Sequence, residues 1–296
     1  MSNDFTFGYL PRTDTPLIVG LSGPSSSGKT GSALELAHGF QEVQGGDIGM
    51  GDSEAGRGNH YQGASMFSDK TKRFKYKYTE FGAPFSPENY TRMVEGAVKQ
   101  GIKHLIIDST SHLHEGVGGI LEWHEREVER LAKAWGVSAD KANIPAWGKP
   151  KAALSAFRNF FTQQKINLIF CFRAKEKIKL IGGKPSAQGF QPIISEELVF
   201  EMTASFLLYP GAQGVPTFTP DEQDEKKVIK VPEYFKPVFE KDPKRALSAW
   251  HGKQMARWAK GGTSQPESQP APATPPAQAP ANAPTNTPSN PSSDIL

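Results

Sequence analysis

A glycine-rich segment near the N-terminus constrains the fold of this chain more than any other feature. Residues 23–30 read Gly-Pro-Ser-Ser-Ser-Gly-Lys-Thr, directly after the apolar run 17–22. This spacing is that of a P-loop, in which backbone N–H groups surround phosphates, the lysine reaches the β- and γ-phosphates and the hydroxyl ligates Mg²⁺. Residues 31–40 place apolar side chains on one helical face, so a helix N-terminus would point at the anion. The predicted nucleotide-binding residues are Gly23, Pro24, Ser25, Ser26, Ser27, Gly28, Lys29 and Thr30.

Composition sets the outer limits of the prediction. With 296 residues and 37% hydrophobic content, the chain can bury one substantial core. No window approaches 18 consecutive apolar residues, and residues 1–4 lack the pattern of a signal peptide, so we expect a cytoplasmic protein without membrane contact. The single cysteine, Cys171, lies in an apolar run, which predicts a buried, inert thiol.

The C-terminal segment differs in character from the rest of the chain. Residues 261–296 are rich in proline and alanine, carry only Glu267 and Asp294 as charges and contain no aromatic residue, which predicts disorder. The expected organisation is a polar leader over 1–15, one domain over 16–260 and a disordered tail over 261–296 whose tip, residues 294–296, could dock on a partner. The net charge of +3 overall rises to +5 over the first 260 residues, which permits a nucleic-acid partner without requiring one.

Polar residues follow three predicted strands. The segment 47–51 delivers Asp52-Ser53-Glu54 to a strand end, where Glu54 could orient or deprotonate water or could simply be a solvated acid. The strand 103–109 contains Asp108 after an apolar run, the Walker B pattern, in which the carboxylate holds Mg²⁺ through water. The strand 166–172 ends at Arg173, a candidate γ-phosphate sensor or arginine finger, with solvated hairpin residues as the alternative.

Two further segments can be interpreted as either structural or functional. Residues 70–78 alternate basic and aromatic side chains, which favours an edge strand with a core-facing aromatic side over a nucleic-acid face. The histidines and acids between 112 and 125 invite a zinc site, but their spacing favours a polar helix over 119–136.

The remaining pattern predicts helices over 87–100, 151–164 and 243–260 and strands over 201–209 and 227–231. Residues 136–150 read as a turn-rich break, 182–185 as a hairpin turn and 186–192 as a loop.

Together these motifs resemble the bacteriophage RecA-like AAA-domain ATPases, a family that includes Sak-type single-strand annealing proteins and recombinases. The resemblance spans residues 16–260 and lies in the P-loop and in the segments 52–58, 85–90, 106–109, 146–148 and 172–175. It implies an α/β fold with a RecA-like P-loop NTPase core, a mostly parallel sheet flanked by helices.

The resemblance also implies site residues and partners. ATP and Mg²⁺ are the expected cofactors, Thr30 and Asp108 the expected metal residues, and Glu54, Lys29 and Arg173 the expected catalytic residues. RecA itself has an amide where this chain has Arg173. Recombinases contact DNA through loops that correspond to residues 113–150 and 179–192. Single-stranded DNA, a homo-oligomer and a single-strand DNA-binding protein or replication partner are therefore expected.

The expected function is ATP-dependent DNA recombination or repair, through annealing or strand exchange, in a host cytoplasm if the protein is phage-encoded. The alternatives are a small-molecule phosphotransferase and a nucleotide-gated adaptor in DNA replication or packaging.

Overall fold

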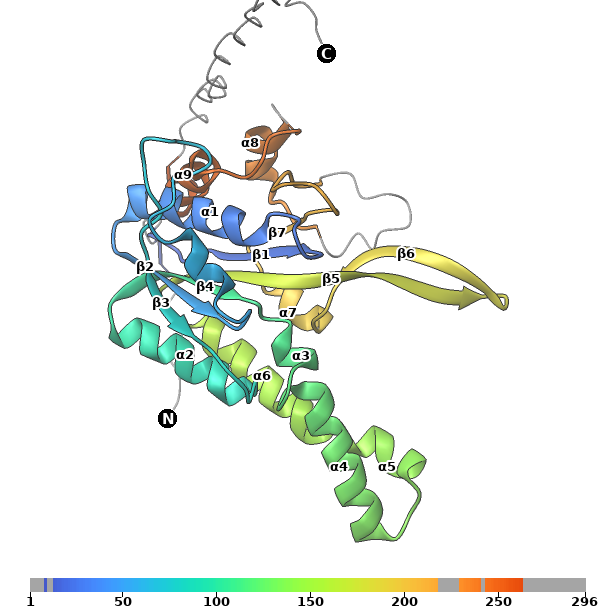
Figure 1. Ribbon diagram of the computed structural model, residues 1–296. Helices are drawn as coiled ribbons and strands as arrows, with labels where there is room; N and C mark the ends of the chain where they lie inside the picture. The colour runs from blue at the N-terminus through green and yellow to red at the C-terminus, as the bar shows by residue number, and fades with distance from the viewer. Residues whose placement is uncertain (1–7, 10–12, 218–228, 241–242, 263–296) are drawn as a thin grey trace, which may run out of the picture.

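The computed structural model describes residues 8–9, 13–217, 229–240 and 243–262 and centres on one β-sheet (Figure 1). Along the sheet the strands run in the order β3-β2-β4-β5-β1-β7, and β6 pairs with the outer half of β5. Every strand pair along that order is parallel, whereas β5 and β6 are antiparallel. The strands are β1 (Ile18–Gly23), β2 (Asp47–Asp52), β3 (Lys77–Glu80), β4 (Ile102–Asp108), β5 (Asn167–Ile181), β6 (Lys184–Pro192) and β7 (Ala204–Leu207).

The strand order gives the fold its class. The P-loop strand β1 does not pair with β4, which carries Asp108, because β5 lies between them. In the register of the sheet, Gly23 at the end of β1 lies opposite Arg173 of β5, and Asp108 of β4 lies opposite Cys171. The predicted fold class is confirmed: the protein has a RecA-like α/β P-loop fold, a mostly parallel sheet flanked by helices.

Helices cover both faces of the sheet (Figure 1). On one face, α1 (Lys29–Gln44), α8 (Lys236–Glu240) and α9 (Ala249–Ala259) enclose a core that includes Leu34, Phe40 and Phe206. On the other, α2 (Pro87–Lys99), α6 (Gly148–Thr162) and α7 (Glu196–Phe200) enclose a core that includes Tyr90, Phe157 and Phe170. Two short segments are 3-10 helices, η1 (Arg57–Tyr61) and η3 (Glu233–Phe235).

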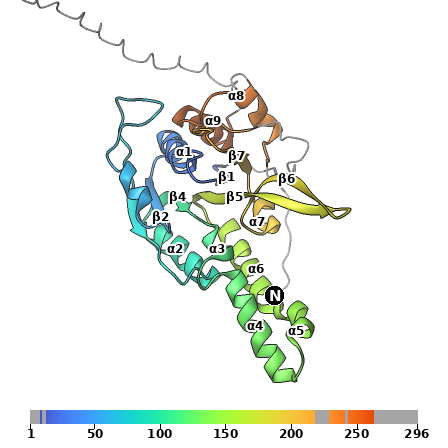
Figure 2. The same ribbon diagram turned by 45° about the vertical axis from the view of Figure 1, so that its right-hand side comes forward.

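Two structures project from this body (Figures 1 and 2). The first is a helical arm of α4 (Ile120–Trp135) and α5 (Ala139–Ala146), joined to β4 through the single turn α3 (His112–Glu115). The second is the β5–β6 hairpin, in which β5 runs out of the parallel sheet and continues as far as Ile181. Gly182 and Gly183 close the hairpin with positive φ angles of 58° and 79°, which suits a tight two-residue turn.

Most predicted helices and strands are present, but several predicted ranges differ from the observed ones. Residues 70–78 were expected to form one strand, but only Lys77–Glu80 is strand, at the sheet edge. The expected alternation of faces holds, since Phe74 and Tyr76 are buried while Arg73, Lys75 and Lys77 are exposed. The predicted break at 136–150 is wrong because residues 139–146 form α5, and the predicted loop 186–192 is wrong because it pairs with β5.

Three further expectations need correction or lie partly outside the described residues. The last helix, α9, begins at Ala249, six residues later than predicted. Ser248 and His251 form a capping box that fixes this N-terminus. The predicted strand 227–231 is represented by a single bridge at Lys230, and residues 227–228 are not described. The proposed leader and tail lie largely outside the described residues.

Candidate nucleotide-binding site

The P-loop joins β1 to α1, and its conformation is fixed by left-handed residues and by contacts with the loop after β7. Ser26 and Gly28 take left-handed backbone conformations with φ of 62° and 98°, which turn the chain sharply before the helix. Gly28 admits no side chain, because an added Cβ would lie 2.3 Å from the backbone nitrogen of Gly214. That same N–H donates to the carbonyl of Ser27 at 2.9 Å, so the loop after β7 supports the P-loop from behind.

A cleft of about 380 Å³ opens beside the P-loop at the carboxyl ends of the central strands. Open α/β sheets bind ligands at this edge. The cleft is lined by Ser25, Ser26, Gly28, Lys29, Thr30, Glu54, Arg57, His60, Tyr61, Asp108 and Arg173. Two cavities of similar volume, about 390 and 410 Å³, lie between β3 and α2 and at the base of the β5–β6 hairpin, but neither contains a P-loop residue. We therefore place the candidate site in the cleft that the P-loop forms.

Lys29 and Thr30 begin α1 and face the cleft. The Lys29 Nζ donates to the carbonyl of Pro24 at 2.7 Å, which folds the side chain back over its own loop. Burial lowers the pKa of Lys29, and the nearby Asp108 carboxylate opposes this shift. Thr30 Oγ1 donates to Asp108 Oδ2 at 2.5 Å. Ser27 is fully buried, and its hydroxyl has no hydrogen-bond partner within the part of the chain that the structure describes.

Asp108 ends β4 on the floor of the cleft. Burial raises the pKa of Asp108 to about 6, against the hydrogen bond from Thr30 and the charge of Lys29. A hydroxyl and a carboxylate are oxygen donors of the kind that Mg²⁺ binds together with phosphate oxygens and water. The Thr30–Asp108 pair therefore fits a magnesium ion.

Glu54 follows β2 and forms an ion pair with Arg173. Arg173 donates from Nε to Oε1 at 2.8 Å and from a terminal nitrogen to Oε2 at 2.7 Å, the two-pronged geometry that guanidinium and carboxylate favour. Burial raises the pKa of Glu54, but the hydrogen bonds and charge of Arg173 outweigh it and hold the pKa below its ordinary value. Glu54 is therefore ionised at neutral pH. Two predicted catalytic residues, distant in sequence, thus meet directly.

A second layer of polar residues, which the sequence did not single out, positions this pair. Asp52 accepts hydrogen bonds from the backbone of Glu54 at 2.6 Å and of Gly58 at 2.8 Å, and from the Tyr78 hydroxyl at 2.8 Å. These bonds fix the turn that carries Glu54. The available signal was position alone, because Asp52 ends a buried strand two residues before Glu54.

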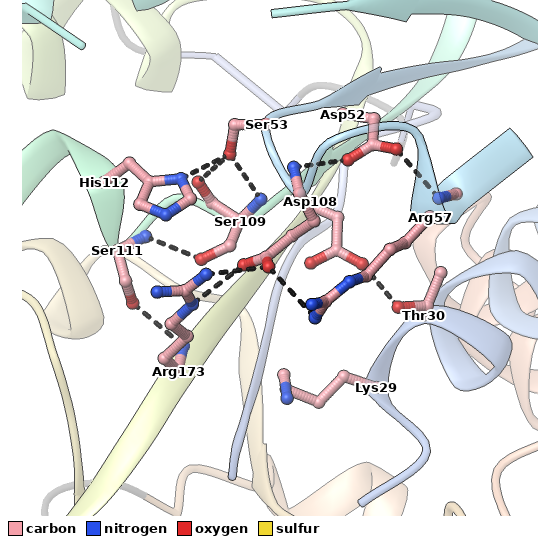
Figure 3. Close-up of polar contacts among 12 residues, drawn as sticks. Lys29, Thr30, Asp52, Ser53, Arg57, Asp108, Ser109, Ser111, His112 and Arg173 are labelled. Atoms are coloured by element: carbon pink, nitrogen blue, oxygen red, sulfur yellow. Dashed lines mark hydrogen bonds and ion pairs between the residues drawn. The ribbon is translucent and has the colours of Figure 1, made fainter. Parts of the chain in front are cut away.

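The start of α3 supports the same turn from the other side (Figure 3). His112 Nδ1 lies 2.7 Å from Ser53 Oγ, and the His112 ring stacks on Phe85 with centroids 4.8 Å apart. Ser111 Oγ accepts a hydrogen bond from the backbone N–H of Arg173 at 2.8 Å. Burial and the charge of Arg173 lower the pKa of His112. The histidines between 112 and 124 have different partners, since His112 contacts Ser53 whereas His124 of α4 stacks on Trp147.

The other sequence predictions about this region can be placed briefly. Cys171 is fully buried in β5, and burial raises the pKa of its thiol well above the ordinary value, as expected of an inert cysteine. Arg57, His60 and Tyr61 of η1 line the cleft opposite the P-loop, although the sequence assigned them no role. Within the described ranges, no helix has the length and apolar character needed to cross a membrane.

Comparisons with known proteins do not identify a family for this chain. No protein-family model matches the chain, and no curated protein matches it. Forty-five chains of solved structures do match. One of them is a KaiC-like protein from the hyperthermophilic archaeon Pyrococcus horikoshii, with 16% sequence identity and a TM-score of 0.36 over 67% of this chain and 80% of that chain. The class of the fold follows from the strand order described above.

Proposed function

We propose that the protein is a Mg²⁺-dependent ATPase of the RecA-like class. The observation that carries this proposal is the convergence of Lys29, the Thr30–Asp108 pair and the Glu54–Arg173 pair on one cleft beside the P-loop. A cation for phosphate, oxygen donors for a metal and an ionised carboxylate for water are the parts that phosphoryl transfer needs.

Each of these cleft residues has a separate role in the proposed hydrolysis. The P-loop backbone and Lys29 bind the triphosphate, and Glu54 orients a water molecule for in-line attack on the γ-phosphorus. As the new phosphorus–oxygen bond forms, the bond to the bridging oxygen breaks, the water proton passes to Glu54, and ADP and phosphate leave. Arg173 occupies two of the roughly four acceptor positions of the carboxylate, so others remain open to water.

Thr30 and Asp108 would hold Mg²⁺, which when bound neutralises charge on the phosphate oxygens. The low pKa of Glu54 makes it a weak base. It therefore suits a reaction in which the proton leaves water late, after most of the bond to the leaving group has broken.

We further propose that this ATPase acts on single-stranded DNA, in annealing or strand exchange, as a homo-oligomer encoded by a phage. The support is the family resemblance together with the basic β5–β6 hairpin, whose exposed lysines include Lys175, Lys177 and Lys184. The hairpin continues the same strand that carries Arg173, so a ligand on the hairpin and a nucleotide in the cleft would contact one element.

The test measures ATP hydrolysis with and without single-stranded DNA, together with DNA binding over a salt series. We expect DNA to stimulate hydrolysis and its affinity to fall as salt rises, because phosphate contacts release counterions. Hydrolysis without DNA binding or stimulation would reject the DNA role and leave the ATPase intact. Phosphate transfer to a small-molecule acceptor would instead favour a phosphotransferase, and nucleotide binding without turnover would favour a nucleotide-gated adaptor.

Two substitutions test the proposed chemistry. Lys29→Ala should lower turnover by about 100-fold or more, because the charge that binds the terminal phosphates is lost. Glu54→Gln should keep nucleotide affinity and lower turnover by about 100- to 10,000-fold, because the amide cannot accept the water proton. Steady-state rates and nucleotide titrations measure both effects. If Glu54→Gln loses nucleotide binding instead, Glu54 is a structural residue.

A further inference from the structure

Glu54 contacts two arginines, Arg57 and Arg173, that are held in very different ways. Arg173 is fixed along its whole length. Its backbone belongs to β5 opposite Gly23, its N–H donates to Ser111 Oγ, and its guanidinium donates to both oxygens of Glu54. Two of its side-chain donors are therefore committed to a neighbour within the same chain.

Among the described residues, Arg57 is held mainly through its backbone. It opens η1 directly after Ala55 and Gly56, whose φ angles of 57° and 83° turn the chain back toward the cleft. Gly58 anchors the turn, because its N–H donates to Asp52 and its carbonyl accepts from the Tyr76 hydroxyl.

The Arg57 side chain itself is 72% exposed, and its terminal nitrogen lies 3.7 Å from Glu54 Oε2. That distance is longer than a hydrogen bond, so the contact constrains the guanidinium weakly.

The charges of the cleft indicate what a loosely held guanidinium would bind. Lys29, Arg57 and Arg173 face Glu54 and Asp108, and Arg173 is already paired with Glu54. Among the described residues, the Arg57 guanidinium has one long contact, so its donors remain available in a cleft that contains the P-loop. A planar guanidinium matches phosphate oxygens in two-pronged fashion. Moving Arg57 breaks one long, exposed contact, whereas moving Arg173 would leave the Glu54 carboxylate, only 14% exposed, without its main partner.

We propose that Arg57 is a catalytic residue that binds the terminal phosphate of a nucleoside triphosphate from within the same chain, and that Arg173 is a positioning residue for Glu54. This inference rests on the proposed function. It assigns to Arg57 the charge-stabilising role that the sequence suggested for Arg173, and it makes a second subunit unnecessary for that contact.

The experiment compares the affinity of two ligands, ADP and the slowly hydrolysed ATPγS, in the full chain. Arg57→Ala should weaken ATPγS binding by about 10-fold or more while ADP binding changes less than about 3-fold, because only the third phosphate loses its partner. Turnover should fall by about 100-fold or more, and added guanidinium ion should restore part of it. Arg92→Ala is the matched control, since Arg92 is 68% exposed in a single ion pair outside the cleft.

The positioning role of Arg173 has a separate readout. Arg173→Ala should lower turnover yet keep the preference for ATPγS over ADP. In the Glu54→Gln background it should cost little more turnover, because a residue that acts through Glu54 has nothing left to position. Arg57→Ala in that background should still lose the ATPγS preference.

The reverse result would overturn the assignment: Arg173→Ala abolishes the preference for the third phosphate and Arg57→Ala keeps it. A protein that is not an ATPase would give a different result. Wild-type protein would then bind ATPγS more tightly than ADP without hydrolysing ATP, and the binding comparison would still decide the role of Arg57. Thermal unfolding of Arg57→Ala should match wild type, since an exposed side chain with one long contact contributes little to stability.

Discussion

Two carboxylates of the cleft, Glu54 and Asp108, have opposite environments. Arg173 holds the pKa of Glu54 below its ordinary value, whereas burial raises that of Asp108 to about 6. Environments that separate two acids in this way assign them different tasks. Glu54 stays ionised, as its proposed role in orienting water requires. Asp108 accepts a hydrogen bond from the Thr30 hydroxyl and gains its full charge most readily when a cation compensates for burial.

Asp52 provides a test of how far Glu54 depends on its surroundings. Asp52→Asn replaces one acceptor oxygen by an N–H₂ group, which would face the N–H or hydroxyl donors of Glu54, Gly58 or Tyr78. The Glu54 turn should shift, and turnover should fall by about 10-fold or more with little change in nucleotide affinity. Tyr78→Phe removes a single donor and should cost less. Equal kinetics for Asp52→Asn and wild type would show that the turn does not need Asp52.

At the scale of residues, the sequence predicts the motif residues of the site but not the side chains that they contact. Lys29, Thr30 and Asp108 follow from spacing, because a P-loop and a strand-end acid are local patterns. The Glu54–Arg173 pair joins residues from separate strands, and the contact depends on β5 lying between β4 and β1. Arg57 carries no local signal, because its position in the cleft results from the two left-handed residues before it.

Among the elements, β4 is tied to its neighbours by a buried histidine. His104 is fully buried, with Nε2 2.8 Å from the Gly45 carbonyl and Nδ1 2.8 Å from the Asn167 amide nitrogen. The neutral ring with its proton on Nε2 satisfies both contacts. A second proton on Nδ1 would face the amide N–H₂, so the fold requires His104 to be neutral. Burial lowers its pKa to about 4.

This histidine predicts a dependence of stability on pH. Between the ordinary pKa of 6.5 and about 4, the unfolded chain binds a proton at His104 that the folded chain does not. The free energy of unfolding therefore falls as pH drops through that window, by about 3 kcal/mol for this residue. Urea unfolding at pH 7 and pH 4.5 should show a smaller difference for His104→Gln than for wild type. The exposed His60→Gln is the control; if His104→Gln and His60→Gln behave alike, His104 is not the group responsible.

The errors in the predicted elements share a physical cause. Residues 186–192 have no alternating apolar pattern, and they form β6 because β5 offers them a partner strand. Residues 139–146 contain Pro145 and few apolar side chains, yet Ala142 and Ala146 pack against Leu131 of α4 and stabilise α5. Local sequence predicted the buried central elements well, since their periodicity reflects burial. It failed for α5 and β6, whose structure depends on a single neighbouring element, although α4 formed where a helix was predicted over 119–136.

On the scale of the whole molecule, the hairpin and the helical arm both project from the body (Figure 2). Each is connected to a strand that contributes a residue to the cleft, Arg173 of β5 and Asp108 of β4. Arg173 and Lys175 lie on the same strand, and α3 joins Asp108 to the arm within a few residues. These two projections contain the segments, 179–192 and 113–150, that the resemblance predicts to contact DNA. The exposed surfaces differ, because the hairpin presents Lys175, Lys177 and Lys184 with the 74% exposed Leu180, while α4 alternates acids and bases. We expect the hairpin to contribute more to DNA affinity.

A shortened hairpin tests this expectation without disturbing the cleft. Lys175 and Gln191 are directly paired, so residues 176–190 can be replaced by a two-residue Asn-Gly turn. Basal ATP hydrolysis should stay within about 2-fold of wild type, because Arg173 and the parallel part of β5 remain. DNA affinity should fall by about 10-fold or more, and its salt dependence should become shallower as phosphate contacts are lost. Alanine at Lys133 and Lys141 of the arm is the matched control. If that control loses DNA binding and the shortened hairpin keeps it, the arm is the DNA-contacting element, and coupling to the cleft must run through α3.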